Sequence, residues 1–214
     1  MPDKAYVVVE GPIGVGKTTL CRRLAREWKA RLVLEEVEEN PFLPLFYRDR
    51  KSWAFQTQIS FMTSRFSQQR RLVQPDLFSS RTVADYMFAK DRIFASVNLS
   101  PEEFDLYQRL ASILDSEVPR PDLVLYLQAS PDVLLERIAA RGRHYERDMS
   151  RSYIQAISEA YNDFFFRDRL FPTLVVNTDG ADFLEDEGDF RSLLRAVEEH
   201  GGGMESFVPM LEGG

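Results

Sequence analysis

The chain has 214 residues, 44% of them hydrophobic and 29% charged, with a formal net charge of −7. These are ordinary values for one globular domain, and the negative charge argues against a nucleic-acid partner. The single cysteine, Cys21, excludes an internal disulfide and fits a reducing cytoplasm, where we expect the protein to work. No apolar run reaches the length of a membrane span, so we expect no membrane partner.

A nucleotide-binding motif dominates the start of the chain. Residues 6–9 form a β-branched run that predicts a buried strand, and residues 20–26 predict a helix. Between them, GPIGVGKT fits G-x-x-x-x-G-K-[ST] without mismatch, in the order that a phosphate-binding loop requires. The residues expected to bind the triphosphate are Gly11, Pro12, Ile13, Gly14, Val15, Gly16, Lys17, Thr18 and Thr19.

The chemistry of this loop predicts its cofactors. Glycine N–H groups and the start of the helix attract an anion, and Lys17 can reach the β- and γ-phosphates. The hydroxyl of Thr18 is a natural ligand of Mg²⁺. We therefore expect ATP, or another nucleoside triphosphate, together with Mg²⁺.

Four further strands are predicted at residues 31–35, 82–85, 123–127 and 173–177. Helices are predicted at 52–72, 86–97, 101–116, from 131 onward, 153–166 and 190–199, and the third opens with a capping-box pattern, Ser100-Pro101-Glu102-Glu103. This alternation indicates an α/β fold with a five-stranded parallel sheet flanked by helices. Because ligands of such sheets bind at the carboxyl ends of the strands, the phosphate loop, Glu35 and Asp85 should face one cleft.

The residues beyond the loop favour a small-molecule kinase. The sequence has no convincing N-K-x-D motif for guanine, and no D-x-x-G follows a strand where a GTPase switch would lie. It has an acid after the second strand, another after the third, and an arginine-rich segment at 141–151. The acids can accept a proton or hold a metal, and the basic segment can neutralise a transferring phosphoryl group.

In this order of motifs the chain resembles the deoxynucleoside kinase family. Residues 10–20 are similar to its E-G-x-I-x-x-G-K-[ST]-T start, and residues 35–37 to its E-P-V element. The resemblance implies a P-loop kinase fold in one domain over residues 1–200, with an arginine-rich lid at about 141–151 and a tail at 201–214. It also implies phosphorylation of the 5′-hydroxyl of a deoxynucleoside by a homodimer.

The resemblance assigns roles to single residues. Glu35 would be the general base on the 5′-hydroxyl, and Asp85 would hold metal with Thr18 or accept a proton. The residues implied at the nucleoside are Glu35, Tyr47, Gln58, Arg65, Asp85, Asp91 and Glu146. Among them, Tyr47 and Glu146 would contact the 3′-hydroxyl, while the base would be bound by Gln58, Arg65 and Asp91. The cations implied at the phosphates are Lys17, Arg137, Arg141 and Arg143.

One position departs from the family pattern. Tyr86 stands where the family has an arginine after the acid, and the sequence offers Arg81, Arg147 or Arg151 as replacements. The Asp85-Tyr86 pair and the stretch ENPFLPLFY resemble bacterial purine deoxynucleoside kinases. The resemblance therefore implies deoxyguanosine or deoxyadenosine as the substrate.

Plainer interpretations remain open at this point. Glu35 lies in a run of glutamates that could be a solvated loop, Arg65 and Asp91 could be a structural ion pair, and Gln58, Tyr47 and the lid arginines could have no ligand. The nearest alternative function is a nucleoside monophosphate kinase, such as a thymidylate kinase. We expect Glu35 and its acidic neighbours to repel the second phosphate of such an acceptor. A nucleotide-binding regulator is a further alternative.

Overall fold

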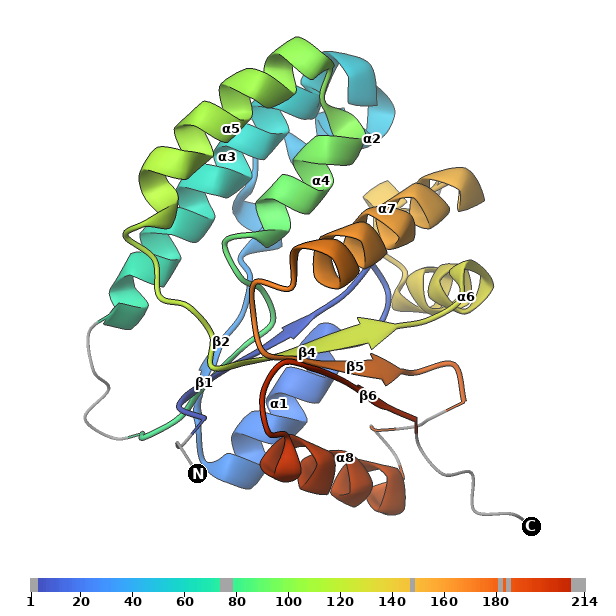
Figure 1. Cartoon of the computed structure of the whole chain (residues 1–214). Coiled ribbons are helices and arrows are strands. Elements are labelled where there is room, and N and C mark those ends of the chain that lie inside the picture. Colours follow the sequence, from blue (N-terminus) through green and yellow to red (C-terminus); the bar gives the residue numbers. More distant parts are fainter. Residues whose placement is uncertain (1–3, 74–78, 147–148, 181–182, 184–185, 209–214) are drawn as a thin grey trace.

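The protein is represented by a computed structural model that describes residues 4–73, 79–146, 149–180, 183 and 186–208. A fully parallel sheet of six strands lies at its centre, in the order β2-β3-β1-β4-β5-β6 (Figure 1). The strands are β1 (Tyr6–Glu10), β2 (Arg31–Val33), β3 (Thr82–Ala84), β4 (Leu123–Gln128), β5 (Thr173–Asn177) and β6 (Met204–Phe207). The predicted α/β fold with a parallel sheet is confirmed, but the predicted number of five strands is wrong.

The additional strand, β6, lies in the segment that the sequence analysis treats as a tail. It pairs with β5 in parallel register, with Thr173 opposite Met204. Of its four residues, Glu205 and Ser206 are exposed, because β6 is the edge of the sheet. A strand this short and polar lacks the apolar run by which the other strands are predicted.

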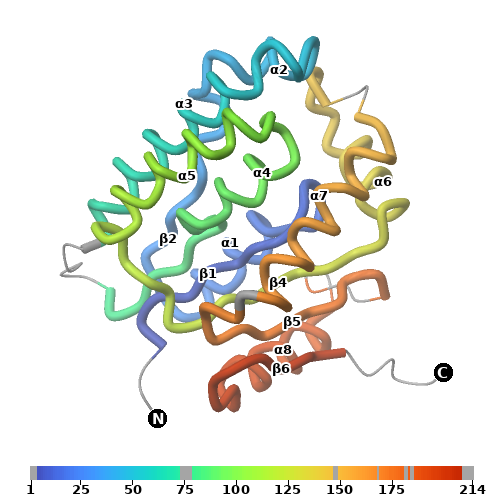
Figure 2. Tube along the Cα trace, turned by 45° about the horizontal axis from the view of Figure 1, so that its top comes forward, coloured from blue at the N-terminus to red at the C-terminus, as the bar shows by residue number. Residues whose placement is uncertain are grey.

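Helices cover both faces of the sheet. They are α1 (Lys17–Trp28), α2 (Leu43–Arg48), α3 (Arg50–Arg70), α4 (Lys90–Asn98), α5 (Pro101–Asp115), α6 (Pro131–Arg141), α7 (Arg151–Asp163) and α8 (Glu187–Glu199). In Figure 1, α1 and α8 lie on one side of the sheet and α4 and α7 on the other, while α3 and α5 run side by side beyond α4, as Figure 2 also shows. None of the helices in the described ranges has the length and apolar character of a membrane span.

Hydrogen bonds explain where two elements differ from their predicted bounds. The strand predicted at 31–35 ends at Val33, because the N–H of Glu35 donates to Asp85 Oδ1 at 2.7 Å. The helix predicted from residue 86 begins at Lys90 instead. The N–H of Met87 donates to Glu10 Oε1 at 2.9 Å, which holds the segment between β3 and α4 against the end of β1. Both differences place polar groups at the carboxyl ends of the strands.

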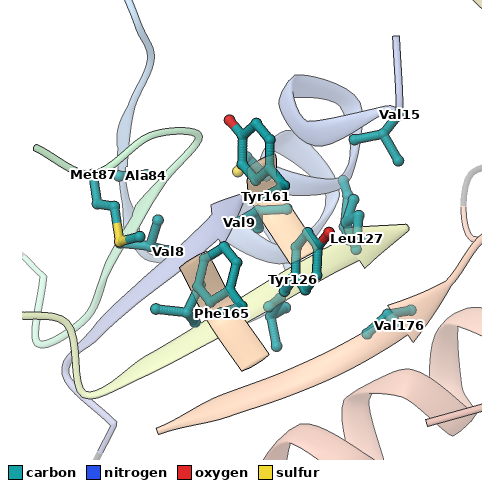
Figure 3. Packing of buried hydrophobic residues seen from close by; sticks show 14 of the residues in the cluster. Val8, Val9, Val15, Ala84, Met87, Tyr126, Leu127, Tyr161, Phe165 and Val176 are labelled. Carbon is teal, nitrogen blue, oxygen red and sulfur yellow. The ribbon is translucent and has the colours of Figure 1, made fainter. Parts of the chain in front are cut away.

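The core fixes the strands that carry these ends. Val8 and Val9 of β1 have no exposed surface, and Tyr126 of β4 stacks on Phe165 at a centroid distance of 4.5 Å (Figure 3). Tyr161 of α7 stacks on the same tyrosine ring at 6.0 Å. Apolar side chains on both faces of β1 and β4 thus hold the two central strands in place, and the phosphate loop begins where β1 ends.

Candidate active site

A cavity of about 850 Å³ opens at the carboxyl ends of the strands. The predicted site residues that line it are Ile13, Gly14, Val15, Gly16, Lys17, Thr18, Thr19, Glu35, Tyr47, Gln58, Arg65, Asp85, Arg137, Arg141, Arg143 and Glu146. Gly11, Pro12 and Asp91 are buried and do not belong to the lining. The phosphate loop and the two strand-end acids therefore line one cavity.

Close packing determines the shape of the phosphate loop. At Gly11, where φ is +149°, a Cβ atom would lie 2.4 Å from the carbonyl oxygen of Leu127 on β4. At Gly14, where φ is +86°, it would lie 2.7 Å from the side chain of Ile138 on α6. Any other residue at these positions would push the loop away from β4 or α6, so the motif glycines set its distance from both elements.

The side chain of Lys17 folds back over the phosphate loop. Its Nζ donates to the carbonyl oxygens of Gly11 at 2.8 Å and Pro12 at 3.0 Å. Burial lowers the pKa of Lys17 to about 8, and the positive charge of Lys90 contributes to the same shift. Phosphate oxygens in the loop would offer this buried ammonium stronger acceptors than two neutral carbonyl groups.

Thr18 and Asp85 bring two hard oxygen ligands together. The hydroxyl of Thr18 donates to Asp85 Oδ2 at 2.5 Å. Magnesium in nucleotide sites is held by one or two protein oxygens and by the phosphates themselves. The described residues contain no group of three or more His, Cys, Asp or Glu side chains that could hold a metal. This donor set fits an ion that binds together with a triphosphate.

Glu35 is held between two cations. Its Oε1 accepts from Arg65 Nε at 2.8 Å and Nη2 at 2.5 Å, and its Oε2 accepts from Lys90 Nζ at 2.5 Å. Burial alone would raise the pKa of Glu35, but Lys90 and Arg65 outweigh it and lower the pKa to about 2. The carboxylate is therefore ionised throughout the physiological pH range.

The other glutamates of this run turn away from the cavity. Glu36 and Glu39 line a separate hollow beside α3, and Glu38 Oε1 lies 3.6 Å from Arg143. The expectation that the acidic neighbours of Glu35 line the acceptor pocket is therefore wrong. Glu38 and Glu39 belong to the short turn at Val37–Glu39, and Glu36 precedes it.

Arg65 connects Glu35 to a second buried acid. Its Nη1 donates to Asp91 Oδ1, and the hydroxyl of Tyr107 donates to Asp91 Oδ2 at 3.1 Å. Asp91 has no exposed surface, and burial raises its pKa to about 6 although Arg65 acts in the opposite direction. Asp91 thus supports Arg65 from behind, while Arg65 itself lines the cavity.

The arginine-rich segment closes the opposite side of the cavity. Arg141 Nη2 donates to Glu146 Oε2 at 2.6 Å, and Arg143 Nη1 lies 3.7 Å from Glu146 Oε1. The ring of Tyr145 stacks on Tyr47 at a centroid distance of 5.4 Å, which joins this segment to α2. Glu146 therefore neutralises two arginines at the cavity wall. On α6, Arg137 donates to the hydroxyl of Thr178 at 2.9 Å and to its carbonyl oxygen at 2.8 Å.

Neither Arg81 nor Arg151 takes the place of the arginine that the family has at position 86. Tyr86 is fully buried, and its hydroxyl donates to Gln68 of α3 at 2.5 Å. Arg81 precedes β3, at the end of the strand opposite the cavity, and Arg151 pairs with Asp132 on the surface at 2.9 Å. Neither of these two arginines lines the cavity, and Arg147 lies outside the described residues.

Two charged residues of the site were given no role from the sequence. Glu10 accepts from the N–H of Gly11 at 3.2 Å, from the N–H of Met87 at 2.9 Å and from the hydroxyl of Tyr161 at 3.0 Å, so it joins the loop to α7 and to the connection between β3 and α4. Lys90 lines the cavity. In the sequence, Glu10 is marked as a carboxylate that ends an uncharged strand, and Lys90 as the first charge after the apolar run at 86–89.

Comparisons with known proteins agree with this geometry. A family model described as deoxynucleoside kinase matches residues 7–200. Deoxyguanosine kinase of Bacillus subtilis is 33% identical over 204 residues, which are 93% of this chain and 99% of the relative. Deoxyadenosine/deoxycytidine kinase of the same bacterium is 31% identical over 205 residues, 92% and 93% of the two chains. A solved deoxyadenosine kinase from M. mycoides with bound dATP has the same fold, with a TM-score of 0.78 at 23% identity over 91% of this chain and 99% of that one.

Proposed function

Because the chain belongs to the deoxynucleoside kinase family, we propose that it transfers the γ-phosphoryl group of ATP to the 5′-hydroxyl of deoxyguanosine or deoxyadenosine. The observation that carries the proposal is that Glu35 and Lys17 line the same cavity. A carboxylate for the hydroxyl proton and a cation for the phosphates are the two groups that this transfer requires.

The residues of the cavity divide the reaction between them. Glu35 accepts the proton of the 5′-hydroxyl as its oxygen attacks the γ-phosphorus, and Lys17 stabilises the phosphates. Arg137, Arg141 and Arg143 grip the phosphates from the other side, where Arg141 and Arg143 exchange Glu146 for phosphate oxygens. Thr18 and Asp85 would hold Mg²⁺, which would supply positive charge to offset that of the phosphates.

The part of the cavity that α2 and α3 line suits a nucleoside. Gln58 and Arg65 point to it from α3, and an amide offers a base edge a donor and an acceptor together. Phe46 and Phe61 add aromatic walls, and the Arg65 guanidinium lies 4.5 Å from the centroid of the Phe61 ring. Tyr47 and Glu146 lie where the lid meets α2, and we assign them to the 3′-hydroxyl.

A substrate panel tests this function. The purified chain, with ATP and Mg²⁺, is offered the four deoxynucleosides and, side by side, their 5′-monophosphates. We expect deoxyguanosine or deoxyadenosine to be phosphorylated with the highest kcat/KM and the monophosphates not to react. Faster phosphorylation of any monophosphate, thymidylate included, would show that the chain is a nucleoside monophosphate kinase. ATP hydrolysis that no acceptor stimulates would support a nucleotide-binding regulator.

We propose that the protein is a homodimer formed through α5. Leu106, Leu110 and Ile113 follow one another at helical spacing and are 44%, 38% and 67% exposed. They lie on the helix that, with α3, forms the outermost layer beyond α4 (Figure 1). Apolar side chains gathered on one helix face favour association with an equally apolar surface, which a second copy supplies.

Light scattering tests the dimer with a charged substitution. We expect the mass of a dimer for the natural chain and that of a monomer for Ile113→Glu, because two-fold pairing would bury both new carboxylates. Leu170→Glu is the matched control, since Leu170 is 54% exposed and lies outside α5. A natural chain with the mass of a monomer, or equal masses for both variants, would refute this interface.

A further inference from the structure

Lys90 is a buried cation to which the transfer reaction assigns no role. It is the first residue of α4, its side chain is 6% exposed, and it lines the cavity. Burial of an ammonium group is unfavourable, and the N-terminal end of a helix disfavours positive charge. The fold of α4 therefore gives no reason for a lysine here, and the reason must lie in what its Nζ contacts.

The surroundings of Lys90 resemble a site for an anion. Its ammonium group donates to Glu35 Oε2, the oxygen that Arg65 does not hold. It also repels the ammonium group of Lys17, which lines the same cavity. An anion between Lys17 and Lys90 would be attracted by both. The phosphoryl group that passes from the loop to the acceptor hydroxyl is such an anion.

Lys90 also fits the one departure from the family pattern. Position 86 carries a tyrosine that points into the protein toward α3, and neither Arg81 nor Arg151 reaches the cavity. Lys90 follows Tyr86 by four residues and enters the cavity from the first position of α4, where the connection from β3 ends. Its Nζ lies 5.9 Å from the centroid of the ring of Phe94, which lines the same cavity.

We propose that Lys90 is a catalytic residue that contacts the transferring phosphoryl group, in the place of the missing arginine. The inference rests on the proposed kinase function. The ammonium group of Lys90 exchanges Glu35 Oε2 for a phosphoryl oxygen. The bond from the γ-phosphorus to the bridging oxygen breaks, the bond to the 5′-oxygen forms, and the hydroxyl proton passes to the carboxylate oxygen that Lys90 has released. One movement thus stabilises the phosphoryl group and frees the base.

Steady-state kinetics of Lys90 variants test this role. We expect Lys90→Met to lower kcat by about 10²-fold, the usual effect of removing one donor to a developing charge. The KM values for ATP and deoxynucleoside should change by less than about threefold, because the contact is made in the transition state. Lys90→Arg should recover most of the turnover. Lys51→Met, at an exposed lysine of α3, is the control and should behave as the natural chain.

A double-mutant cycle separates contact with phosphate from an indirect effect. If Lys90 contacts the phosphoryl group, Lys90→Met lowers the residual kcat of Glu35→Gln by a further factor of about 10 or more. If Lys90 only positions Glu35, it adds nothing in that background, and the proposal is overturned. Natural turnover in Lys90→Met overturns it as well. A natural chain that phosphorylates no deoxynucleoside would refute the proposed function instead.

Discussion

Replacing Glu35 with glutamine is expected to reduce kcat by about 10²-fold or more, the usual contribution of a general base. Glutamine keeps the size and one carbonyl oxygen of the side chain, so it can still accept hydrogen bonds from Arg65 or Lys90. It cannot accept the proton of the 5′-hydroxyl. Binding of the nucleoside depends mainly on other side chains of α2 and α3, so KM for the deoxynucleoside should change much less than kcat.

The neighbouring carboxylate provides the control for this variant. Glu36→Gln removes the same charge from an exposed side chain that lines the separate hollow beside α3, so its kcat should equal that of the natural chain. Thermal unfolding of Glu35→Gln would show that the loss of turnover does not come from loss of the fold. Unchanged turnover in Glu35→Gln would refute its assignment as the base.

Replacing Arg65 with methionine is expected to lower the free energy of unfolding by about 3 kcal/mol or more. Arg65 is paired with two buried carboxylates, and removing one partner of a buried ion pair commonly costs about 3–5 kcal/mol. Glu35 would keep Lys90, but Asp91 would keep only the hydroxyl of Tyr107 among its side-chain hydrogen bonds described above. Urea or thermal unfolding measures the loss directly.

The loss should depend on pH. Burial already raises the pKa of Asp91 from 3.8 to about 6, and removal of Arg65 raises it further. A carboxyl group with a higher pKa in the folded state binds more protons when folded, so its contribution to stability falls as pH rises from 3.8 through the folded-state pKa. Arg65→Met should therefore be more destabilising at pH 8 than at pH 5.

An exposed ion pair gives the matched control for Arg65. Arg109 pairs with Asp105 at 2.7 Å on the surface of α5, with 71% and 68% of the two side chains exposed. Arg109→Met should change the free energy of unfolding by less than about 0.5 kcal/mol at either pH. Equal effects of the two substitutions would show that the buried network contributes no more than a surface pair.

Short sequence motifs predict a structural feature correctly where the feature depends on residues that are close together in the chain. The glycine-lysine motif predicts the loop because its glycines adopt positive φ angles, +149° at Gly11 and +86° at Gly14, which other residues rarely adopt. The capping box at Ser100 is confirmed too: Glu103 N–H donates to Ser100 Oγ at 3.3 Å, and Ser100 N–H donates to Glu103 Oε2 at 2.9 Å. The strand-end rule places Glu35 and Asp85 at one cavity because every strand of the sheet is parallel.

Features that depend on contacts between distant segments could not be predicted. Lys90 reaches the cavity because Met87 is tied to Glu10, which delays the start of α4 to Lys90. Sequence periodicity contains no sign of that contact. Similarly, β6 forms because β5 offers a free edge. Each of these outcomes is decided by a partner far along the chain.

A structure of the chain with deoxyguanosine and a non-hydrolysable ATP analogue tests the central claim most directly. The account predicts the γ-phosphate in the loop beside Lys17 and the 5′-oxygen of the sugar within about 3 Å of a Glu35 carboxylate oxygen. It also predicts that the 5′-oxygen lies between that carboxylate and the γ-phosphorus. A nucleoside bound with its 5′-hydroxyl directed away from Glu35 would contradict it.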